Sequence, residues 1–178
     1  MKQRLFAALA FAAIALAPAL PAAASTLDIS ADRAWHNFYF DETAGSSFLD
    51  DFAFNDPDTL SFNLSLSAPA WLRVADIGLA GDRFSLFLNG ASLGATSVPT
   101  GGDSDFTLDF DQAMGSDVWS HGSWLLAAGD YTITGSVLFA PFGPGSGGLS
   151  VSAVPEPGSA ALLLAGCGLL AAIRRRRS

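Results

Sequence analysis

The sequence has few of the residues that disulfide-bonded, zinc-binding or histidine-dependent domains require. Its single cysteine, Cys167, lies near the C-terminus, so the preceding part of the chain forms no disulfide bond. Only two histidines, His36 and His121, are present, and neither lies in a Gly-x-Ser-x-Gly nucleophile turn. Two distant histidines make a poor zinc site in the absence of cysteine. We therefore expect neither a hydrolase triad nor a zinc centre, and we assign no catalytic residue.

Basic residues are nearly absent from the middle of the chain. Of nine Lys and Arg, only Arg33, Arg73 and Arg83 lie between residues 25 and 153. Sixteen acidic residues lie in the same range, so its formal charge is −13, three minus sixteen. Nucleic-acid binding is not expected, because contact with phosphates needs a basic surface. The excess negative charge favours solubility.

The remaining basic residues lie at the two ends, and the C-terminal end has a distinctive order. Val154, Pro155, Glu156 and Pro157 precede an uncharged apolar run over residues 158–173, and Arg174, Arg175, Arg176 and Arg177 follow. The prolines prevent a helix from starting before residue 158. As a helix the run would span roughly 24 Å, slightly less than the ~30 Å hydrocarbon core, which snorkelling arginines and local thinning can accommodate. The arginines indicate a cytoplasmic end and an external body.

This order resembles the PEP-CTERM sorting signal of Gram-negative bacteria, over residues 154–178. The resemblance implies recognition by an exosortase, a membrane transpeptidase-like enzyme, and cleavage near the Pro-Glu-Pro motif. It further implies an intermediate tethered in the inner membrane and final delivery to the cell surface or an exopolysaccharide matrix. The segment is also known as an ice-binding-protein C-terminal domain, which does not imply ice binding here. A buried C-terminal helix is the alternative, but a core helix rarely ends in four arginines.

The first 24 residues are typical of a secretory signal peptide. Lys2 and Arg4 form the positive region, residues 5–16 form the apolar region, and residues 22–24 supply small side chains at the −3 and −1 positions. We expect export through the Sec translocon and cleavage after Ala24, with a retained N-terminal anchor as the alternative. Residues 25–153 then remain, enough for one domain with a core of its own.

Apolar and polar side chains alternate in this body. The pattern recurs over residues 60–66, 84–88, 106–111 and 131–139. Period two is typical of half-buried strands, and turn-forming residues separate the segments. No helical periodicity of useful length is present. We expect an all-β fold, a single antiparallel β-sandwich of jelly-roll type, with the run 141–148 as a loop before a final strand at 149–153 or as the start of a linker.

Two short segments sharpen this expectation. Asn89-Gly90 lies between two apolar stretches and predicts a hairpin with a type I′ turn, which needs positive φ twice. The segment ending at Tyr131 resembles the tyrosine corner of sandwich domains, in which the hydroxyl bonds to upstream backbone; an ordinary strand start is the alternative.

The body also has a resemblance of its own. Val74-Ala75-Asp76, Gly81-Asp82-Arg83-Phe84, Asn89-Gly90, Leu93-Gly94 and Thr96-Ser97 together resemble a segment of secreted PEP-CTERM proteins. Residues 48–52 match the FxDxF pattern that names one such subgroup. Neither resemblance brings a catalytic residue, so both imply an exported β-domain without an assigned reaction.

Acidic clusters are the main candidates for metal binding, because Ca²⁺ takes carboxylate and carbonyl oxygens. The first cluster contains Asp50, Asp51, Asp56 and Asp58, and the second contains Asp103, Asp105, Asp109 and Asp111. Asp76 and Asp82 form a third, smaller possibility. None has EF-hand spacing, and a solvated acidic face is the alternative. No other cofactor is expected.

Carbohydrate binding is the alternative to a purely structural role. Aromatic rings can stack on sugars, and Trp35, Trp119 and Trp124 are the candidates, with core packing as the competing interpretation. A pair of carboxylates might also serve a secreted hydrolase, but sequence cannot show the burial that a catalytic acid needs. We therefore expect a non-enzymatic exported protein, structural or adhesive, with an exopolysaccharide-binding module as second and a hydrolase as third interpretation.

Overall fold

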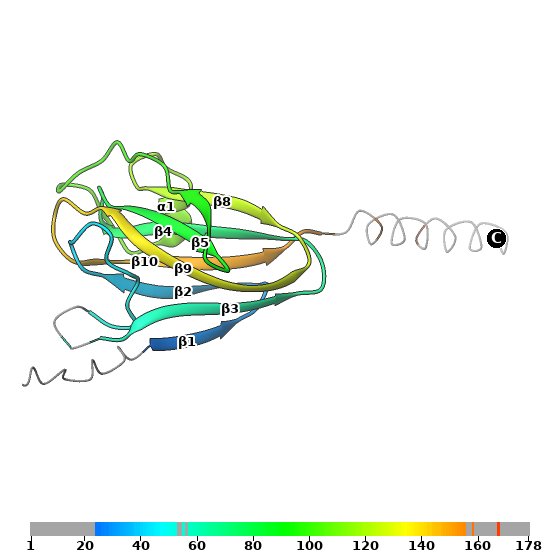
Figure 1. Ribbon diagram of the computed structural model, residues 1–178. Helices are drawn as coiled ribbons and strands as arrows, with labels where there is room; N and C mark the ends of the chain where they lie inside the picture. Colours follow the sequence, from blue (N-terminus) through cyan, green and yellow to red (C-terminus); the bar gives the residue numbers. More distant parts are fainter. Residues whose placement is uncertain (1–23, 53–54, 56, 156–157, 159–166, 168–178) are drawn as a thin grey trace, which may run out of the picture.

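The computed structural model describes residues 24–52, 55, 57–155, 158 and 167, and these form two packed β-sheets (Figure 1). The strands are β1 (Ala24–Ile29), β2 (Asp32–Phe40), β3 (Thr59–Leu66), β4 (Ala70–Leu79), β5 (Arg83–Leu88), β6 (Ala91–Ala95), β7 (Phe106–Thr107), β8 (His121–Leu126), β9 (Gly129–Phe139) and β10 (Gly145–Ala153). One sheet has the order β1-β3-β9-β5-β6; the other has β2-β10-β4-β7, with β8 also paired to β4. The predicted all-β sandwich is confirmed.

One pairing differs from the fully antiparallel arrangement expected from the sequence. β1 and β3 run parallel, with Ala24 opposite Thr59 and Ile29 opposite Leu64. The intervening strand β2 belongs to the other sheet, where it pairs with β10. The chain therefore reverses twice between β1 and β3 and returns in its original direction.

The core lies between the two sheets and follows the predicted alternation. In β3, Leu60, Phe62, Leu64 and Leu66 are buried, whereas the residues between them are partly or fully exposed. Several phenylalanines fill the centre, and Phe38 and Phe48 stack with ring centroids 3.7 Å apart. A Cβ atom at Gly135 would clash with the ring of Phe48, so this glycine makes room for the aromatic cluster. Burial of these side chains is the main source of stability.

The two predicted turn features are confirmed. Asn89 and Gly90 have φ values of 50° and 80°, and they connect β5 to β6 through the pair Leu88–Ala91, as a type I′ turn requires. The hydroxyl of Tyr131 donates to the carbonyl of Ala127 at 3.1 Å, which is the bond expected of a tyrosine corner.

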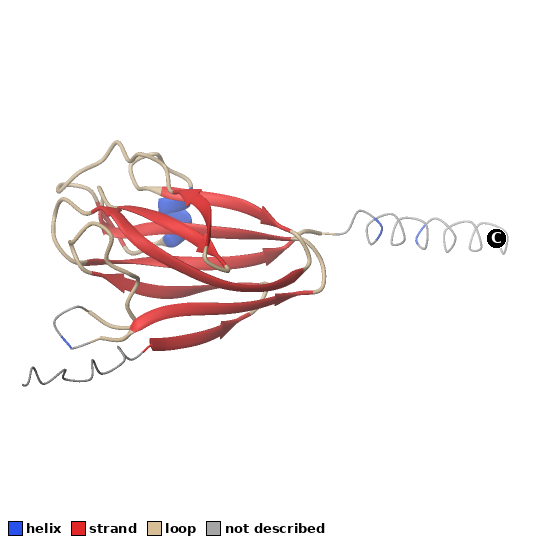
Figure 2. Ribbon diagram, in the orientation of Figure 1, coloured by secondary structure: helices blue, strands red, loops and turns tan. Residues whose placement is uncertain are grey.

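The half-buried strand expected over residues 106–111 is wrong: only Phe106–Thr107 form a strand, β7, the side chains of Phe106 and Leu108 are exposed, and a short helix, α1 (Phe110–Met114), follows. Its five residues are too few to show a helical period. Figure 2 shows it against one of the strand layers. Its Ala113 packs with Ala75 and Ile77 in a second, smaller core cluster on the outer face of β4. Asp109 caps it by accepting hydrogen bonds from the backbone N–H groups of residues 111 and 112.

The final strand is longer than predicted. β10 begins at Gly145, four residues before the expected strand start at Leu149, and it lies between β2 and β4 in the middle of its sheet. Glycines in this strand allow close approach by neighbouring rings; a Cβ atom at Gly147 would clash with Phe38. The run 141–148 is thus part loop and part strand, and it is not a linker. The last backbone bond of the body joins Val154 N–H to the carbonyl of Pro69.

Several sequence predictions concern residues outside those described. Residues 1–23 of the expected signal peptide are among them, and Ala24 is the first residue of β1. The expected membrane helix at 158–173 is also outside, apart from Gly158 and Cys167, as are the four terminal arginines. Within the described part of the chain, no helix is long and apolar enough to cross a membrane.

Candidate functional site

A polar groove crosses the outer face of the first sheet, with a cavity volume of about 580 Å³. We call it the polar groove, and it is lined by Asp28, Ile29, Asn63, Leu64, Ser65, Asn89, Asp130, Tyr131 and Thr132. These residues come from β1, β3, β9 and the β5–β6 turn. Adjacent strands bring them together, because Asp28 pairs with Asn63 and Asn63 pairs with Thr132 in the sheet register.

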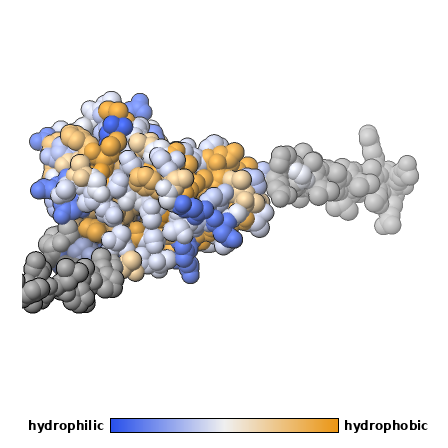
Figure 3. Space-filling model, viewed as in Figure 1, coloured by the Kyte–Doolittle hydropathy of each residue, from blue (hydrophilic) through white to orange (hydrophobic). Residues whose placement is uncertain are grey.

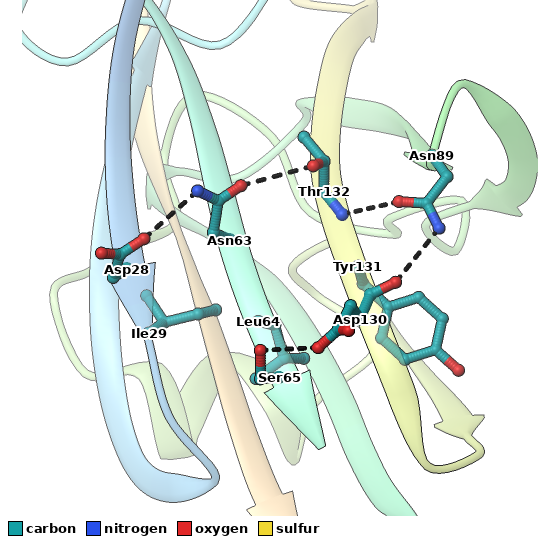
Figure 4. Close-up of a pocket in the computed structure, with 9 residues that line it drawn as sticks. All are labelled: Asp28, Ile29, Asn63, Leu64, Ser65, Asn89, Asp130, Tyr131 and Thr132. Carbon is teal, nitrogen blue, oxygen red and sulfur yellow. Dashed lines mark hydrogen bonds between the residues drawn. The ribbon is translucent and has the colours of Figure 1, made fainter.

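The polar side chains of the groove form a chain of hydrogen bonds (Figure 4). Asn63 Nδ2 donates to Asp28 Oδ1 at 3.2 Å, and Thr132 Oγ1 donates to Asn63 Oδ1 at 3.3 Å. The side chain of Asn89 accepts from Thr132 N–H and donates to the carbonyl of Asp130. This chain fixes the orientation of each amide before any ligand arrives, which lowers the entropy cost of binding.

The groove keeps hydrogen-bonding capacity for a ligand. Ser65 Oγ donates to Asp130 Oδ1 at 2.7 Å, and Asp28 uses only its Oδ1. The second carboxylate oxygen of each aspartate therefore makes no hydrogen bond to the described residues. Two such acceptors are the type of group that recognises hydroxyl-rich ligands, whereas the ring of Tyr131 packs against the main core.

A second region, at one end of the sandwich, has the opposite character. Asp76 lies on β4, on the same strand face as the core residues Leu72 and Val74, and Asp82 immediately precedes β5. Asp76 is 0% exposed and Asp82 is 5% exposed. Asp82 N–H donates to Asp76 Oδ2 at 3.3 Å, which brings the two residues together across the β4–β5 turn. We call them the buried carboxylate pair.

Each carboxylate of the pair has a buried oxygen without a hydrogen-bond partner. Asp76 Oδ1 and Asp82 Oδ1 are both inaccessible to solvent and bond to none of the described residues. The neighbouring cation does not help, because Arg83 donates to the carbonyls of Thr96 and Ser97. An unpaired charge in such a place is costly, so the pair needs a proton or a cation as its partner.

The pKa values of the pair reflect this environment. Burial, followed by the charge of Asp82, raises the pKa of Asp76 from 3.8 to about 9, although backbone N–H groups of residues 82, 81 and 77 oppose the shift. Burial raises the pKa of Asp82 from 3.8 to about 7. Without a bound cation, folding near neutral pH therefore requires Asp76 to take up a proton.

The pair is connected to the surface by a small pocket of about 260 Å³. Asp82 is the carboxylate among its lining residues. The rim is apolar, because Phe106, Leu108 and Phe142 line the pocket and remain exposed. The lining also contains Gly143 and Pro144 from the β9–β10 connection, and Gly145 and Ser146 from the start of β10. Figure 3 shows that apolar and hydrophilic residues alternate over the face in view.

The first acidic cluster expected to bind calcium serves the backbone of its own loop. Asp50 Oδ1 accepts from Asp58 N–H, and Asp51 accepts from Phe52 N–H and from Asn55 Nδ2. Asp56 lies outside the described residues. These bonds shape the loop before β3.

Carboxylates of the second acidic cluster also accept hydrogen bonds from nearby backbone N–H groups. Asp105 Oδ2 accepts from Gly102 N–H, and Asp109 is the N-cap of α1, with Asp111 in its first turn. Asp103 is exposed. In the part of the chain that the structure describes, no three His, Cys, Asp or Glu residues form a group able to hold a metal ion. The structure therefore does not assemble either cluster into a metal site, because their carboxylates turn to separate N–H groups.

The three tryptophans named as candidates for sugar binding lie in different parts of the sandwich. Trp119 is 5% exposed, and its Nε1 donates to the carbonyl of Gly78 at 3.3 Å, so its ring belongs to the second core cluster. Trp35 stacks on Phe110, with their ring centroids 4.5 Å apart. The Arg73 guanidinium lies over the Trp35 ring, 5.2 Å from the ring centroid. Trp124 packs against the main core. The three rings therefore pack in different surroundings rather than as one cluster.

The region around His121 is not arranged as a nucleophile and base. Ser120 Oγ donates to Ser97 O at 2.7 Å, while His121 Nδ1 lies 3.1 Å from Trp119 O. His36 Nε2 is buried without a hydrogen-bond partner among the described residues.

Sequence reasoning missed the polar groove, because its residues are separated by up to about a hundred positions and only the sheet register joins them. Asp76 and Asp82 were predicted only as the third and smallest of the possible calcium sites. A stronger signal was present: Asp76 continues the apolar face Leu72-x-Val74 of a strand, so period two alone places its carboxylate in the core.

Comparison with known families identifies the tail. Residues 153–177 match the PEP-CTERM protein-sorting motif, which confirms the sorting signal expected from the sequence and marks the chain as an exported exosortase substrate. The match begins at Ala153, the last residue of β10. No curated protein matches the chain.

Solved structures show only distant similarity. The pre-peptidase C-terminal domain of a Bacillus anthracis collagenase has 11% identity and a TM-score of 0.37, with 73% of this chain and 97% of that chain covered. The C-terminal CBM6 of LamC from Zobellia galactanivorans has 18% identity and a TM-score of 0.36, with 66% and 79% covered. Aeromonas hydrophila PliG, a periplasmic inhibitor of g-type lysozyme, has 18% identity and a TM-score of 0.36, with 73% and 98% covered. Similarity at this level supports no functional argument.

Proposed function

We propose that the protein is a non-enzymatic surface or matrix domain of structural or adhesive type, released from its sorting tail by an exosortase. Residues 1–24 direct export through the Sec translocon. A helix at 158–173, followed by the four arginines, holds the intermediate in the inner membrane. Cleavage near residues 154–157 then delivers the β-sandwich to the cell surface or the exopolysaccharide matrix.

The position of the sorting motif relative to the sandwich is the main support for this proposal. β10 is a central strand, paired on one side with β2 and on the other with β4. Its pairing ends at Ala153, and Val154 N–H makes the last hydrogen bond, to Pro69. Pro155 has no N–H to extend the strand. A cut after this point removes no strand and exposes no core residue, so the released domain keeps its fold.

The sorting step can be tested in the producing bacterium. We would compare the wild-type protein, a Pro155→Ala/Pro157→Ala variant and a Gly158→Ala control, each with and without the exosortase. The wild type and the control are expected in the medium or surface fraction, whereas the double variant and all proteins in the exosortase-deficient strain remain in the membrane. Release of every form without the exosortase would refute the proposal.

The structural or adhesive role has its own readout. Deletion of the gene is expected to weaken retention of cells in the exopolysaccharide matrix, and the full-length gene restores it. A deletion strain with normal adhesion and normal matrix would contradict this role, even if sorting occurs as proposed.

Binding of carbohydrate is the second candidate, and the polar groove supports it. The groove offers orientated amides and two carboxylate oxygens on the outer strand face. We expect exopolysaccharide purified from the producing bacterium to bind the wild-type protein. We expect this binding to be lost in an Asn63→Ala/Asp130→Ala variant. Asp117→Asn, an acid outside the groove, is the matched control. Equal retention of exopolysaccharide by all three proteins would exclude the groove as its binding site.

A further inference from the structure

We propose that Asp76 and Asp82 form a binding site for one divalent cation, with Ca²⁺ as the preferred ion, reached through the pocket at the end of the sandwich. The proposal does not depend on the sorting route. It rests on two carboxylates that the fold places together and buries, each with an oxygen that lacks any partner among the described residues.

The geometry of the turn explains why the two carboxylates approach each other. β4 and β5 belong to different sheets, so the chain crosses the end of the sandwich between residues 79 and 83. Gly78 and Gly81 have φ values of 91° and 141°, conformations that favour glycine. This crossing directs Asp82 N–H onto Asp76 Oδ2 and leaves both Oδ1 atoms unbonded.

The chemistry of the pair favours a hard cation. Its known donors are carboxylate oxygens, and no cysteine or third carboxylate joins it in a metal-holding group within the described residues. Oxygen donors suit Ca²⁺ and Mg²⁺ better than Zn²⁺ or Cu²⁺. Ca²⁺ accepts irregular coordination and carbonyl ligands, whereas Mg²⁺ demands a near-octahedral shell, so an irregular turn favours Ca²⁺.

Two other partners for the pair are less suitable. An arginine would neutralise the charge, but Arg83 is committed to the carbonyls of Thr96 and Ser97. A proton can bridge the two carboxylates, but it neutralises only one of their two charges and leaves the other charge buried. A divalent cation neutralises both charges and bonds to both oxygens at once.

The location of the site also fits an exported protein. Asp82 lines the pocket of about 260 Å³, so the pair lies next to an opening at the surface. Sites with few carboxylates in extracellular modules bind calcium with Kd values of about 0.1 to 1 mM. Such a site is filled mainly outside the cell, where it would stabilise the domain after export.

Thermal unfolding of the protein purified from the producing bacterium tests the proposal. After removal of metals with a chelator, at about pH 8 and about 150 mM NaCl to screen surface charge, CaCl2 is added to about 10 mM. We expect the Tm to rise by about 5 to 10 °C. Asp76→Asn and Asp82→Asn should each reduce this rise to less than about 2 °C.

Two controls distinguish the site from the acidic surface. Asp130→Asn removes a carboxylate of the polar groove, and Asp50→Asn/Asp58→Asn removes two from the first acidic cluster. Both should keep the full calcium-dependent rise in Tm. No rise in the wild type, or a rise that survives in Asp76→Asn and Asp82→Asn, would overturn the proposal, as would loss of the rise in the surface controls.

A second measurement does not rely on variants that fold. Isothermal titration of the metal-free wild type with CaCl2, repeated with MgCl2, should show one calcium site per chain and weaker binding of magnesium. Terbium bound to the same chain should be displaced by calcium with the same affinity. Absence of a single saturable site would contradict the proposal.

Discussion

The polar groove and the buried carboxylate pair show two ways in which one acidic sandwich uses its aspartates. In the groove, Asp28 and Asp130 lie on an outer sheet face and bond to Asn63 and Ser65. In the pair, Asp76 and Asp82 are removed from water and each keeps an unbonded oxygen. Exposed carboxylates with neutral partners add small stabilising terms, whereas buried ones without partners lower stability until a proton or cation binds.

The difference teaches that charge count alone does not locate function in this protein. The acids that cluster most densely in the sequence, around Asp50 and around Asp109, are used to bond the backbone of loops and to cap α1. Asp76 and Asp82, which lie outside both dense clusters, have the most perturbed environment. Perturbed groups next to a pocket are the better guide to a site.

Replacement of the buried carboxyl group of Asp76 should produce the largest effect. At about pH 8 in chelator, folding of the wild type requires proton uptake by Asp76, because its pKa of about 9 lies far above its unfolded value. Asp76→Asn needs no proton, so we expect its free energy of unfolding to rise by on the order of 2 kcal/mol. Urea unfolding measures it. The matched change Asp130→Asn should instead give a small loss, and a comparable gain there would remove the distinction between the two regions.

The pH dependence should separate the regions next. Asp76 and Asp82 have folded pKa values of about 9 and about 7, both raised above 3.8, so the folded state binds more protons than the unfolded state between these limits. Their contribution to stability is therefore present at low pH and is lost as pH rises from about 4 to about 9.

We would follow this by the Tm in chelator of the wild type and of an Asp76→Asn/Asp82→Asn variant. The advantage of the variant should grow by on the order of 5 °C between about pH 5 and about pH 9. A constant difference would mean that the pair does not titrate as the structure indicates. When calcium is added in excess of the chelator, the Tm of the wild type should approach that of the variant.

A smaller effect is expected at the edge of the groove. Tyr131→Phe removes the hydroxyl that donates to Ala127 O, and we expect a loss of about 1 kcal/mol in the free energy of unfolding. Denaturant titration at about pH 7 measures it, and because the bond involves no titrating acid the loss should be the same at about pH 5. An unchanged midpoint would show that water replaces the hydroxyl as the donor to Ala127 O without cost.

The smallest effect is expected within the groove itself. Asn63→Ala breaks the bonds to Asp28 and Thr132, but all three side chains are exposed or partly exposed, so we expect a loss of about 0.5 kcal/mol. Thermal melting measures it, with Asn37→Ala on β2 as an exposed control. A loss above about 2 kcal/mol would show that the groove is structural.

Much of the sandwich could be predicted from local pattern. Alternation over residues 60–66 and 131–139 identified β3 and β9, and Asn89-Gly90 identified a turn, because period two and positive φ are local properties. The parallel pairing of β1 with β3 could not be predicted, since it depends on β2 joining the other sheet. The five residues of α1 are shorter than the pattern that reveals a helix.

The candidate sites depended more on contacts between distant segments. Asn63 and Thr132 meet only through the register of β3 with β9. The burial of Trp119 follows from its packing under α1, which the sequence did not show. Core packing was the competing interpretation for the tryptophans, and the sequence could not show which of them would be buried.

The central claim is that this sandwich is an exported domain separated from its sorting tail. Intact-mass and terminal-peptide analysis of the protein from the medium and the cell surface tests it most directly. We expect a chain that begins at Ser25 and ends near residues 154–157, after the last strand of the body. A product that retains residues 158–178 in every fraction would contradict it.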